Sequence, residues 1–155
     1  MSQIEKAEGQ IEIKSQADKF FELWTRKSNL ISEWCPDKYP KIELHEGSFH
    51  HSLGAVTTWH FIALGHHDFV KTKVAEIDET NKFVIYNYFE GLGVLRSNFK
   101  YLKSKIQVIP KGDEGCIVKW SFEYEKKSDD APDASLYIDF LLDCTKNLDA
   151  RLCAA

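Results

Sequence analysis

Residues 131–152, APDASLYIDFLLDCTKNLDARL, form the only segment of the chain that is long and periodic enough for a helix of several turns. At 100° per residue its apolar side chains fall on one stripe, with Asp139, Asp143 and Lys146 opposite. Pro132 suits the first turn, because its missing N–H needs no partner there. The stripe, which must be buried, consists of Tyr137, Leu141, Cys144, Leu148 and Leu152.

Upstream of this helix the chain consists mainly of segments with strand character. Alternating, β-branched or aromatic runs separated by turn residues predict seven strands. Between the first two strands, residues 15–27 and 29–34 predict two short helices, and Ser15 with Asp18 has the spacing of a capping box. The expected strands are residues 3–14, 38–46, 55–63, 68–77, 82–89, 98–109 and 116–126.

Tight turns join the last six strands, which predicts an antiparallel meander. A twisted sheet of seven strands curls on itself, and a long helix can fill its open side. The sequence therefore predicts an α+β fold with one helix lying on a curved sheet. With 155 residues, a single domain over 1–155 is expected.

Bulk composition excludes several classes of function. The net charge of −4 with no basic stretch argues against nucleic acid as a partner, and no apolar run has the length of a membrane span. The polar first ten residues do not resemble a signal peptide. Four cysteines without CxxC spacing favour reduced thiols, so a cytoplasmic protein without metal or cofactor is expected.

Several motifs, taken together, resemble the major latex proteins of plants, a branch of the birch-pollen-allergen and pathogenesis-related superfamily. They run in one order through nearly the whole chain and end in the amphipathic helix. The motifs are ELHEG (43–47), GAVxxW (54–59), AEIDETNK (75–82), FEG (89–91), KIQVIPKGD (105–113) and KWSFEYEK (119–126).

This resemblance implies a START-like helix-grip fold, in which the sheet wraps around the long helix and leaves a large apolar cavity between them. It further implies binding of small hydrophobic molecules such as sterols, hormones, flavonoids or alkaloids, and some relatives are cyclases or isomerases. The chain departs from the family in the loop after ELHEG, where SFHHSLG replaces a glycine-rich segment. A phosphate-binding role for that loop is therefore not expected.

Strand alternation, with its register anchored on the resemblance, assigns side chains to the cavity wall. The expected wall is apolar and aromatic with a few polar tips, as in many small-molecule pockets; the alternative is a solid core. Ser104, and Thr72 or Val74, are expected to face the same way. The predicted ligand-binding residues are Phe20, Trp24, Leu30, Ile31, His51, Thr57, Trp59, Phe61, Phe69, Val84, Lys100, Leu102, Ile106, Ile117, Ser121, Tyr137, Leu141 and Cys144.

Four side chains are candidates for catalysis. Tyr86 and Tyr88, two apart on one strand, can offer hydroxyls to a ligand, or they are simply half-buried strand tyrosines. Lys119 inside an apolar wall would act as a base or bind a carbonyl, unless its amine reaches water at the rim. His67 would be a general acid or base, with the solvated loop position as its alternative.

Adjacent histidines point to opposite faces of a strand, so the pairs 50–51 and 66–67 do not predict a metal site. Two functions follow. The first is a carrier or defence-related protein that binds a small hydrophobic plant metabolite, as a monomer or weak dimer. The second is a cofactor-free cyclase or isomerase that holds a reactive intermediate in the same cavity.

Overall fold

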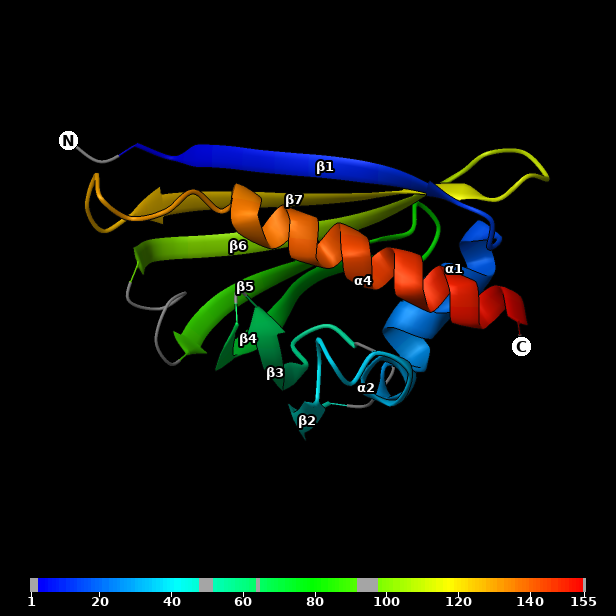
Figure 1. Cartoon of the computed structure of the whole chain (residues 1–155), viewed down its shortest axis with the longest axis horizontal. Helices are drawn as coiled ribbons and strands as arrows, with labels where there is room; N and C mark the ends of the chain where they lie inside the picture. Colours follow the sequence, from blue (N-terminus) through cyan, green and yellow to red (C-terminus); the bar gives the residue numbers. More distant parts are fainter. Residues whose placement is uncertain (1–2, 48–51, 64, 92–97, 155) are drawn as a thin grey trace.

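The computed structural model describes residues 3–47, 52–63, 65–91 and 98–154. They form a seven-stranded antiparallel sheet in the order β1-β7-β6-β5-β4-β3-β2. One long helix, α4, lies across the sheet, and two short helices close one end beneath it (Figure 1). The elements are β1 (Glu5–Ile13), α1 (Ala17–Arg26), α2 (Asn29–Trp34), β2 (Lys41–Glu46), β3 (Val56–Ala63), β4 (His66–Asp78), β5 (Phe83–Gly91), β6 (Phe99–Pro110), β7 (Cys116–Lys126) and α4 (Ser135–Ala154).

The predicted helix-grip architecture is confirmed, and most boundaries agree within a few residues. The main difference is at α4, which begins at Ser135 rather than at residue 131. Pro132 therefore lies in the irregular segment before the helix. Asp133 binds Lys126 at the end of β7, with 2.7 Å between carboxylate and ammonium, and this ion pair holds the turn against the sheet.

The helix lies close against the sheet at Gly9 of β1. A Cβ atom at Gly9 would lie only 2.6 Å from the Cγ2 of Ile138 and 3.2 Å from the Cδ1 of Leu142. A side chain there would push α4 away from the sheet edge. The absence of one allows α4 to pack against β1 and β7.

The C-terminal half of α4 is fastened to the junction between β1 and α1. The carboxylate of Asp149 accepts hydrogen bonds from the backbone N–H groups of Lys14 and Ser15, at 3.2 and 2.9 Å, and from the Ser15 hydroxyl. The predicted capping box at Ser15 is therefore wrong. The N-cap of α1 is Gln16, which makes no side-chain capping bond, because the Ser15 side chain is engaged by the distant helix instead.

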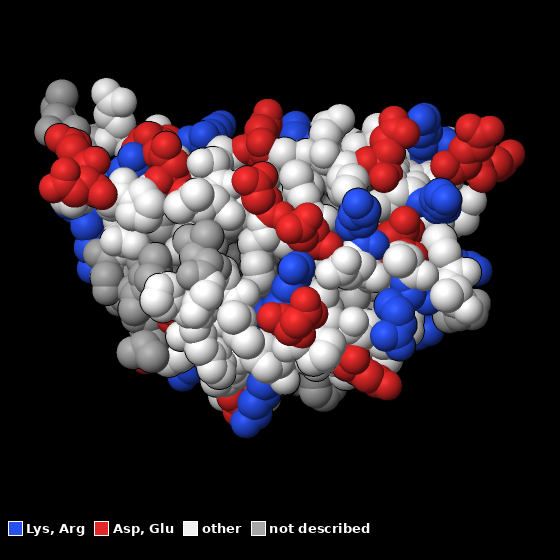
Figure 2. Space-filling model, in the orientation of Figure 1, with Lys and Arg blue, Asp and Glu red and all other residues white. Residues whose placement is uncertain are grey.

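Charged side chains of both signs are interspersed over the face that carries α4 (Figure 2). On this face the mixed charges give no single-sign field of the kind that attracts a polyanion. Among the described residues, no helix is both long enough and apolar enough to cross a membrane.

Candidate functional site

A cavity lies between α4, α1 and the inner face of the sheet. It leaves room of about 40 Å³ for the centres of water-sized molecules, within about 510 Å³ not occupied by atoms. A space of about 15 Å³ by the first measure holds one water, so the interior is narrow. Its wall consists of Trp24, Tyr39, Trp59, Phe61, Val70, Thr72, Tyr86, Tyr88, Ser104, Trp120, Phe122, Tyr137, Phe140 and Leu141.

Aromatic rings dominate this wall and contact one another across it. Trp24 of α1 stacks on Trp59 of β3, with 5.8 Å between ring centres, and meets Trp120 of β7 edge-on at 4.9 Å. Tyr39 packs edge-on against Phe140 of α4 at 5.3 Å. Helices and sheet thus share one aromatic cluster. The ring centres lie 4.9 to 5.8 Å apart, within the range of favourable aromatic pairs.

The indole N–H groups at the cavity are satisfied by protein hydroxyls. Trp24 donates to the Tyr86 hydroxyl and Trp59 to Thr72, each at 2.9 Å. Trp120 donates at 2.9 Å to Thr145 of α4, and the Thr145 hydroxyl in turn donates to a backbone carbonyl of its own helix. These bonds fix the orientation of the rings, so the wall presents mainly apolar ring faces to the space inside.

The tyrosines of the wall stay protonated at neutral pH. Burial raises the pKa of Tyr88 to about 12, although its hydrogen bond to Ser104 opposes the shift. Burial raises the pKa of Tyr137 to about 12 as well, and the charge of Asp68 adds to the effect. The pKa of Tyr86 is also raised by burial. These hydroxyls therefore act as hydrogen-bond donors or acceptors and not as phenolate bases.

Many of the predicted residues do face inward. Among the others, Cys144 is fully buried beside Cys35, away from the cavity wall, and Leu30 is half-buried. Residues that line the cavity as predicted are Trp24, Trp59, Phe61, Tyr86, Tyr88, Tyr137 and Leu141, with Thr72 and Ser104 beside them. Residues that are buried in the surrounding core are Phe20, Ile31, Thr57, Val84, Leu102 and Ile106.

The predicted register of β7 is wrong by one residue. Lys119, together with Ile117 and Ser121, lies on the outer face, and the Lys119 ammonium is 3.4 Å from the carboxylate of Glu8 on the neighbouring strand β1. Trp120 and Phe122 face the cavity instead. Lys119 is therefore excluded as a base inside the cavity, because strand alternation puts its side chain on the far side of the sheet.

Four further predicted residues lie on the outer face or outside the described residues. His67 is exposed and Phe69 half-buried on the outer face of β4, where both rings lie near His60, with ring centres 6.2 and 6.0 Å away. Lys100 is exposed, because a bulge between Phe99 and residue 101 shifts the alternation of β6. His51, expected at the cavity mouth, lies outside the described residues.

Sequence reasoning missed Tyr39, Val70, Trp120, Phe122 and Phe140. For β7 the signal was present: every even-numbered residue from 116 to 124 is apolar or aromatic, and the odd-numbered residues include lysine, serine and glutamate. Tyr39 follows Pro36 in an irregular segment, and Phe140 lies beside the predicted stripe of the helix. Nothing in the local pattern assigns either residue to the cavity.

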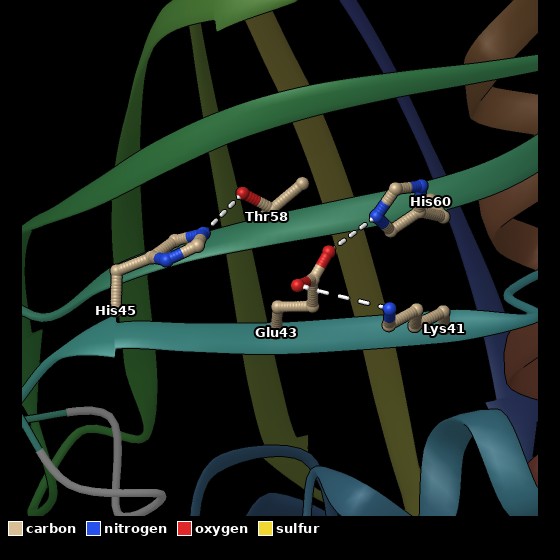
Figure 3. Close-up of polar contacts among 5 residues, drawn as sticks. All are labelled: Lys41, Glu43, His45, Thr58 and His60. Carbon is tan, nitrogen blue, oxygen red and sulfur yellow. Dashed lines mark hydrogen bonds and ion pairs between the residues drawn. The ribbon is translucent and has the colours of Figure 1, made fainter.

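The outer face of strands β2 and β3 carries a separate polar cluster (Figure 3). His60 lies 2.6 Å from the carboxylate of Glu43, which Lys41 also approaches at 3.8 Å, and His45 lies 2.6 Å from the Thr58 hydroxyl. The cluster joins the edge strand β2 to the sheet. Within the described ranges, no group of three His, Cys, Asp or Glu side chains is arranged to hold a metal ion.

The model of the Pathogenesis-related protein Bet v 1 family matches residues 2–155. The chain belongs to this family. Among Bet v 1 relatives, MLP-like protein 43 of Arabidopsis thaliana is 30% identical over 154 residues, covering 99% of this chain and 96% of that protein. The crystal structure of ginseng major latex-like protein 151 from Panax ginseng superimposes with a TM-score of 0.88 at 32% identity, covering 96% and 97% of the two chains.

A more distant structure with the Bet v 1 fold is norcoclaurine synthase from Thalictrum flavum, in complex with dopamine and hydroxybenzaldehyde. Its TM-score is 0.73 at 19% identity, with 97% of this chain and 88% of that one covered. At this identity the likeness concerns the fold alone. The relatives at about 30% identity are thus named as major latex or MLP-like proteins, and an enzyme shares the fold.

Proposed function

We propose that this chain binds a small hydrophobic molecule in the cavity between α4 and the sheet. In this role it acts as a carrier or defence-related protein of the cytoplasm, as a monomer or weak dimer. The observation that carries the proposal is the wall itself, in which ten of fourteen residues are aromatic. With the indoles of Trp24, Trp59 and Trp120 already hydrogen-bonded, an apolar ligand leaves none of their N–H groups without a partner.

The narrow interior adds a requirement. The cavity has only about 40 Å³ for the centres of water-sized molecules, which is too little for a polycyclic ligand. Binding therefore requires aromatic side chains of the wall to change rotamer. The side chains with the fewest polar ties, such as Phe61 and Phe140, are the natural ones to move. Binding is therefore expected to be slower than the diffusion-limited encounter and to quench or shift the fluorescence of the tryptophans in the wall.

A matched pair of variants tests the proposal. Leu141→Phe adds bulk inside the cavity, and Leu136→Phe adds the same bulk on the exposed side of the same helix. Thermal-shift and calorimetric titrations with a flavone, a sterol and a fatty alcohol should show binding to the native chain and to the Leu136 variant. The Leu141 variant should bind about tenfold more weakly, equivalent to about 1.4 kcal/mol. If the native chain binds none of these compounds, the proposal is wrong.

The second candidate is a cyclase or isomerase acting in the same cavity. Its support is the pair of protonated hydroxyls of Tyr86 and Tyr88, which can donate hydrogen bonds to a developing negative charge on a bound intermediate. The outward positions of Lys119 and His67 remove two of the proton acceptors that this function was expected to use.

Native mass spectrometry of protein purified from its own tissue would identify a co-purifying molecule as the starting compound for a turnover assay. For an enzyme, Tyr88→Phe should then lower turnover by at least about tenfold while changing ligand affinity by less than about twofold. Unchanged product distribution in Tyr86→Phe and Tyr88→Phe would leave only the binding function.

A further inference from the structure

Two buried thiols meet where the end of α2 lies beneath α4 (Figure 1). Cys35 directly follows α2 and is 1% exposed, and Cys144, in the middle of α4, is fully buried. Their side chains are hydrogen-bonded to each other. The side-chain amide of Asn147, about one turn further along α4, donates to the Cys35 sulfur at 3.9 Å. The Cys35 sulfur therefore accepts two hydrogen bonds, one of them from a second thiol within its reach.

The two thiols of this pair differ in acidity. The hydrogen bond from Cys144 lowers the pKa of Cys35, burial opposes the shift, and the bond from Asn147 lowers the pKa further. The pKa of Cys144 is raised, because its proton is held by Cys35 and because it is buried. Burial also raises the pKa of Cys116, an equally buried thiol in β7, to about 11. An acidic thiol beside a second thiol is the arrangement that reacts with peroxides and then closes to a disulfide.

The pair lies close behind the cavity wall. The carbonyl of Cys35 accepts a hydrogen bond at 2.9 Å from the N–H of Tyr39, which lines the cavity. Cys144 follows Phe140, another residue of the wall, by one helical turn. The rings of Tyr39 and Phe140 pack edge-on against each other. A change at the two thiols is therefore one turn away from rings that border the cavity.

Residues 34–39 lie along one stripe of α4. The helix positions 140, 144, 147 and 151 recur at a spacing that puts them on one face. All the contacts along this stripe are non-covalent, so the segment and the helix can separate without breaking a bond. In order along the helix, the contacts join Tyr39 to Phe140, Cys35 to Cys144 and Asn147, and Trp34 to Arg151, whose guanidinium lies 5.5 Å from the indole centre.

We propose that Cys35 and Cys144 form a reversible disulfide when the protein reacts with a peroxide, and that this bond holds residues 34–39 against α4. The Cys35 thiolate attacks one oxygen of hydrogen peroxide, the O–O bond breaks, and the hydroxide that leaves takes up a proton to give water. The Cys144 sulfur then attacks the sulfenic acid at Cys35. The S–S bond forms, the S–O bond breaks, and a second water leaves with the Cys144 proton. Two electrons thus pass from the thiols to the peroxide, and a dithiol reductant reverses the reaction.

The bond has a consequence for the cavity. A ligand that needs Tyr39 or Phe140 to change rotamer enters more slowly once the neighbouring residues of segment and helix are joined covalently. This consequence rests on the proposed function, whereas formation of the disulfide does not. A disulfide that forms on demand from reduced thiols is the kind that sensing proteins of reducing compartments use.

Mass spectrometry tests the disulfide in a Cys153→Ser background, which lacks the exposed thiol and so avoids cross-links between molecules. Peroxide should remove two hydrogen atoms from the intact mass, and dithiothreitol should restore them. Tryptic digestion of the oxidised protein should yield peptide 28–38 joined to peptide 128–146. Adding Cys35→Ser should abolish the bridge, and adding Cys116→Ala, which removes an equally buried thiol, should leave it intact. Thermal melting of each reduced variant shows that it is folded.

Two measurements on the reduced and the oxidised protein test the effect on the segment. The N–H groups of Lys38 and Tyr39 donate to the Cys35 carbonyl, and their hydrogen exchange should slow by at least about tenfold on oxidation. Stopped-flow quenching of tryptophan fluorescence by the flavone should show association slowed by about tenfold. With Cys35→Ser added, peroxide should change neither rate.

The proposal is overturned if peroxide leaves the intact mass without this loss, or if the cross-linked peptides do not contain Cys35 and Cys144. It is also overturned if Cys116→Ala prevents the bridge as Cys35→Ser does. A disulfide that leaves hydrogen exchange at residues 38 and 39 unchanged shows that the bond does not hold the segment. Failure of the flavone, the sterol and the fatty alcohol to bind rejects the proposed function, and mass spectrometry and hydrogen exchange then still decide on the disulfide.

Discussion

The two halves of α4 lie in contrasting surroundings. In the N-terminal half, Tyr137, Phe140 and Leu141 face a cavity walled by aromatic rings. In the C-terminal half, Thr145 and Leu148 are fully buried and are not among the residues that line this cavity. One amphipathic stripe therefore serves two purposes. The C-terminal half packs the helix against the sheet and supplies much of the stability. The N-terminal half can therefore border a cavity without destabilising the fold.

Truncation of one leucine in each half should separate these purposes most clearly. Leu148→Ala leaves a new void in a closed core and should lower the free energy of unfolding by about 3 to 4 kcal/mol, whereas Leu141→Ala enlarges space that already exists and should lower it by about 2 kcal/mol. Urea denaturation of both variants measures the difference. Equal losses would mean that the cavity half is packed as tightly as the other half.

Alkaline pH should lower the free energy of unfolding through Tyr137, in the N-terminal half of α4 that faces the cavity. Tyr137 has a folded pKa raised to about 12, above an unfolded value of about 10. Its stabilising effect is complete below pH 10 and is lost as the pH rises from about 10 to 12, by an amount on the order of 2 kcal/mol. Tyr137→Phe should flatten this part of the curve of unfolding free energy against pH. Tyr101→Phe, on the outer face, should leave it unchanged.

The hydrogen bond between α4 and β7 is expected to matter less than Leu148. Thr145→Val keeps the shape of the side chain but leaves the buried Trp120 N–H without its acceptor, which should cost about 1 to 2 kcal/mol of unfolding free energy. The double variant with Thr145→Val and Trp120→Phe should lose less unfolding free energy than the sum of the losses in the two single variants. Additive losses in this double-mutant cycle would show that the bond contributes nothing.

The smallest effect is expected far from both halves, in the cluster of Figure 3. Hydrogen bonding to His60 lowers the pKa of Glu43 below its usual 4.5. Its contribution is present above pH 4.5 and is lost as the pH falls through the lowered value. Glu43→Gln should slightly reduce the acid sensitivity of the melting temperature, with ligand affinity unchanged. Weaker ligand binding would imply that the outer face of β2 influences the cavity.

Strand β7 shows how far sequence patterns reach. Its boundaries follow from composition, and the alternation from Cys116 to Tyr124 contains the correct inward face. The register of β7 was instead anchored on a resemblance to other chains. This shifted the inward face by one residue and assigned Lys119 to the cavity. In β4, placing 67 and 69 inward together with 72 required a break in the alternation, but burial alternates without a break from residue 68 to residue 74. Asp68 is inward for the same reason. The register shift between Lys71 and Thr72 places its extra residue in β5.

The sequence by itself determined the order of elements, the arrangement of one helix on a curved sheet and the buried stripe of α4, because these depend on periodicity and turn chemistry, which are local. Only the tertiary structure decided that Ser15 binds Asp149, that a bulge turns Lys100 outward and that Asp68 is buried beside Phe61 of the aromatic wall. Those outcomes depend on contacts between residues far apart in the chain. The stripe of α4 thus predicts that a face is buried, but the rings opposite it determine where a cavity remains.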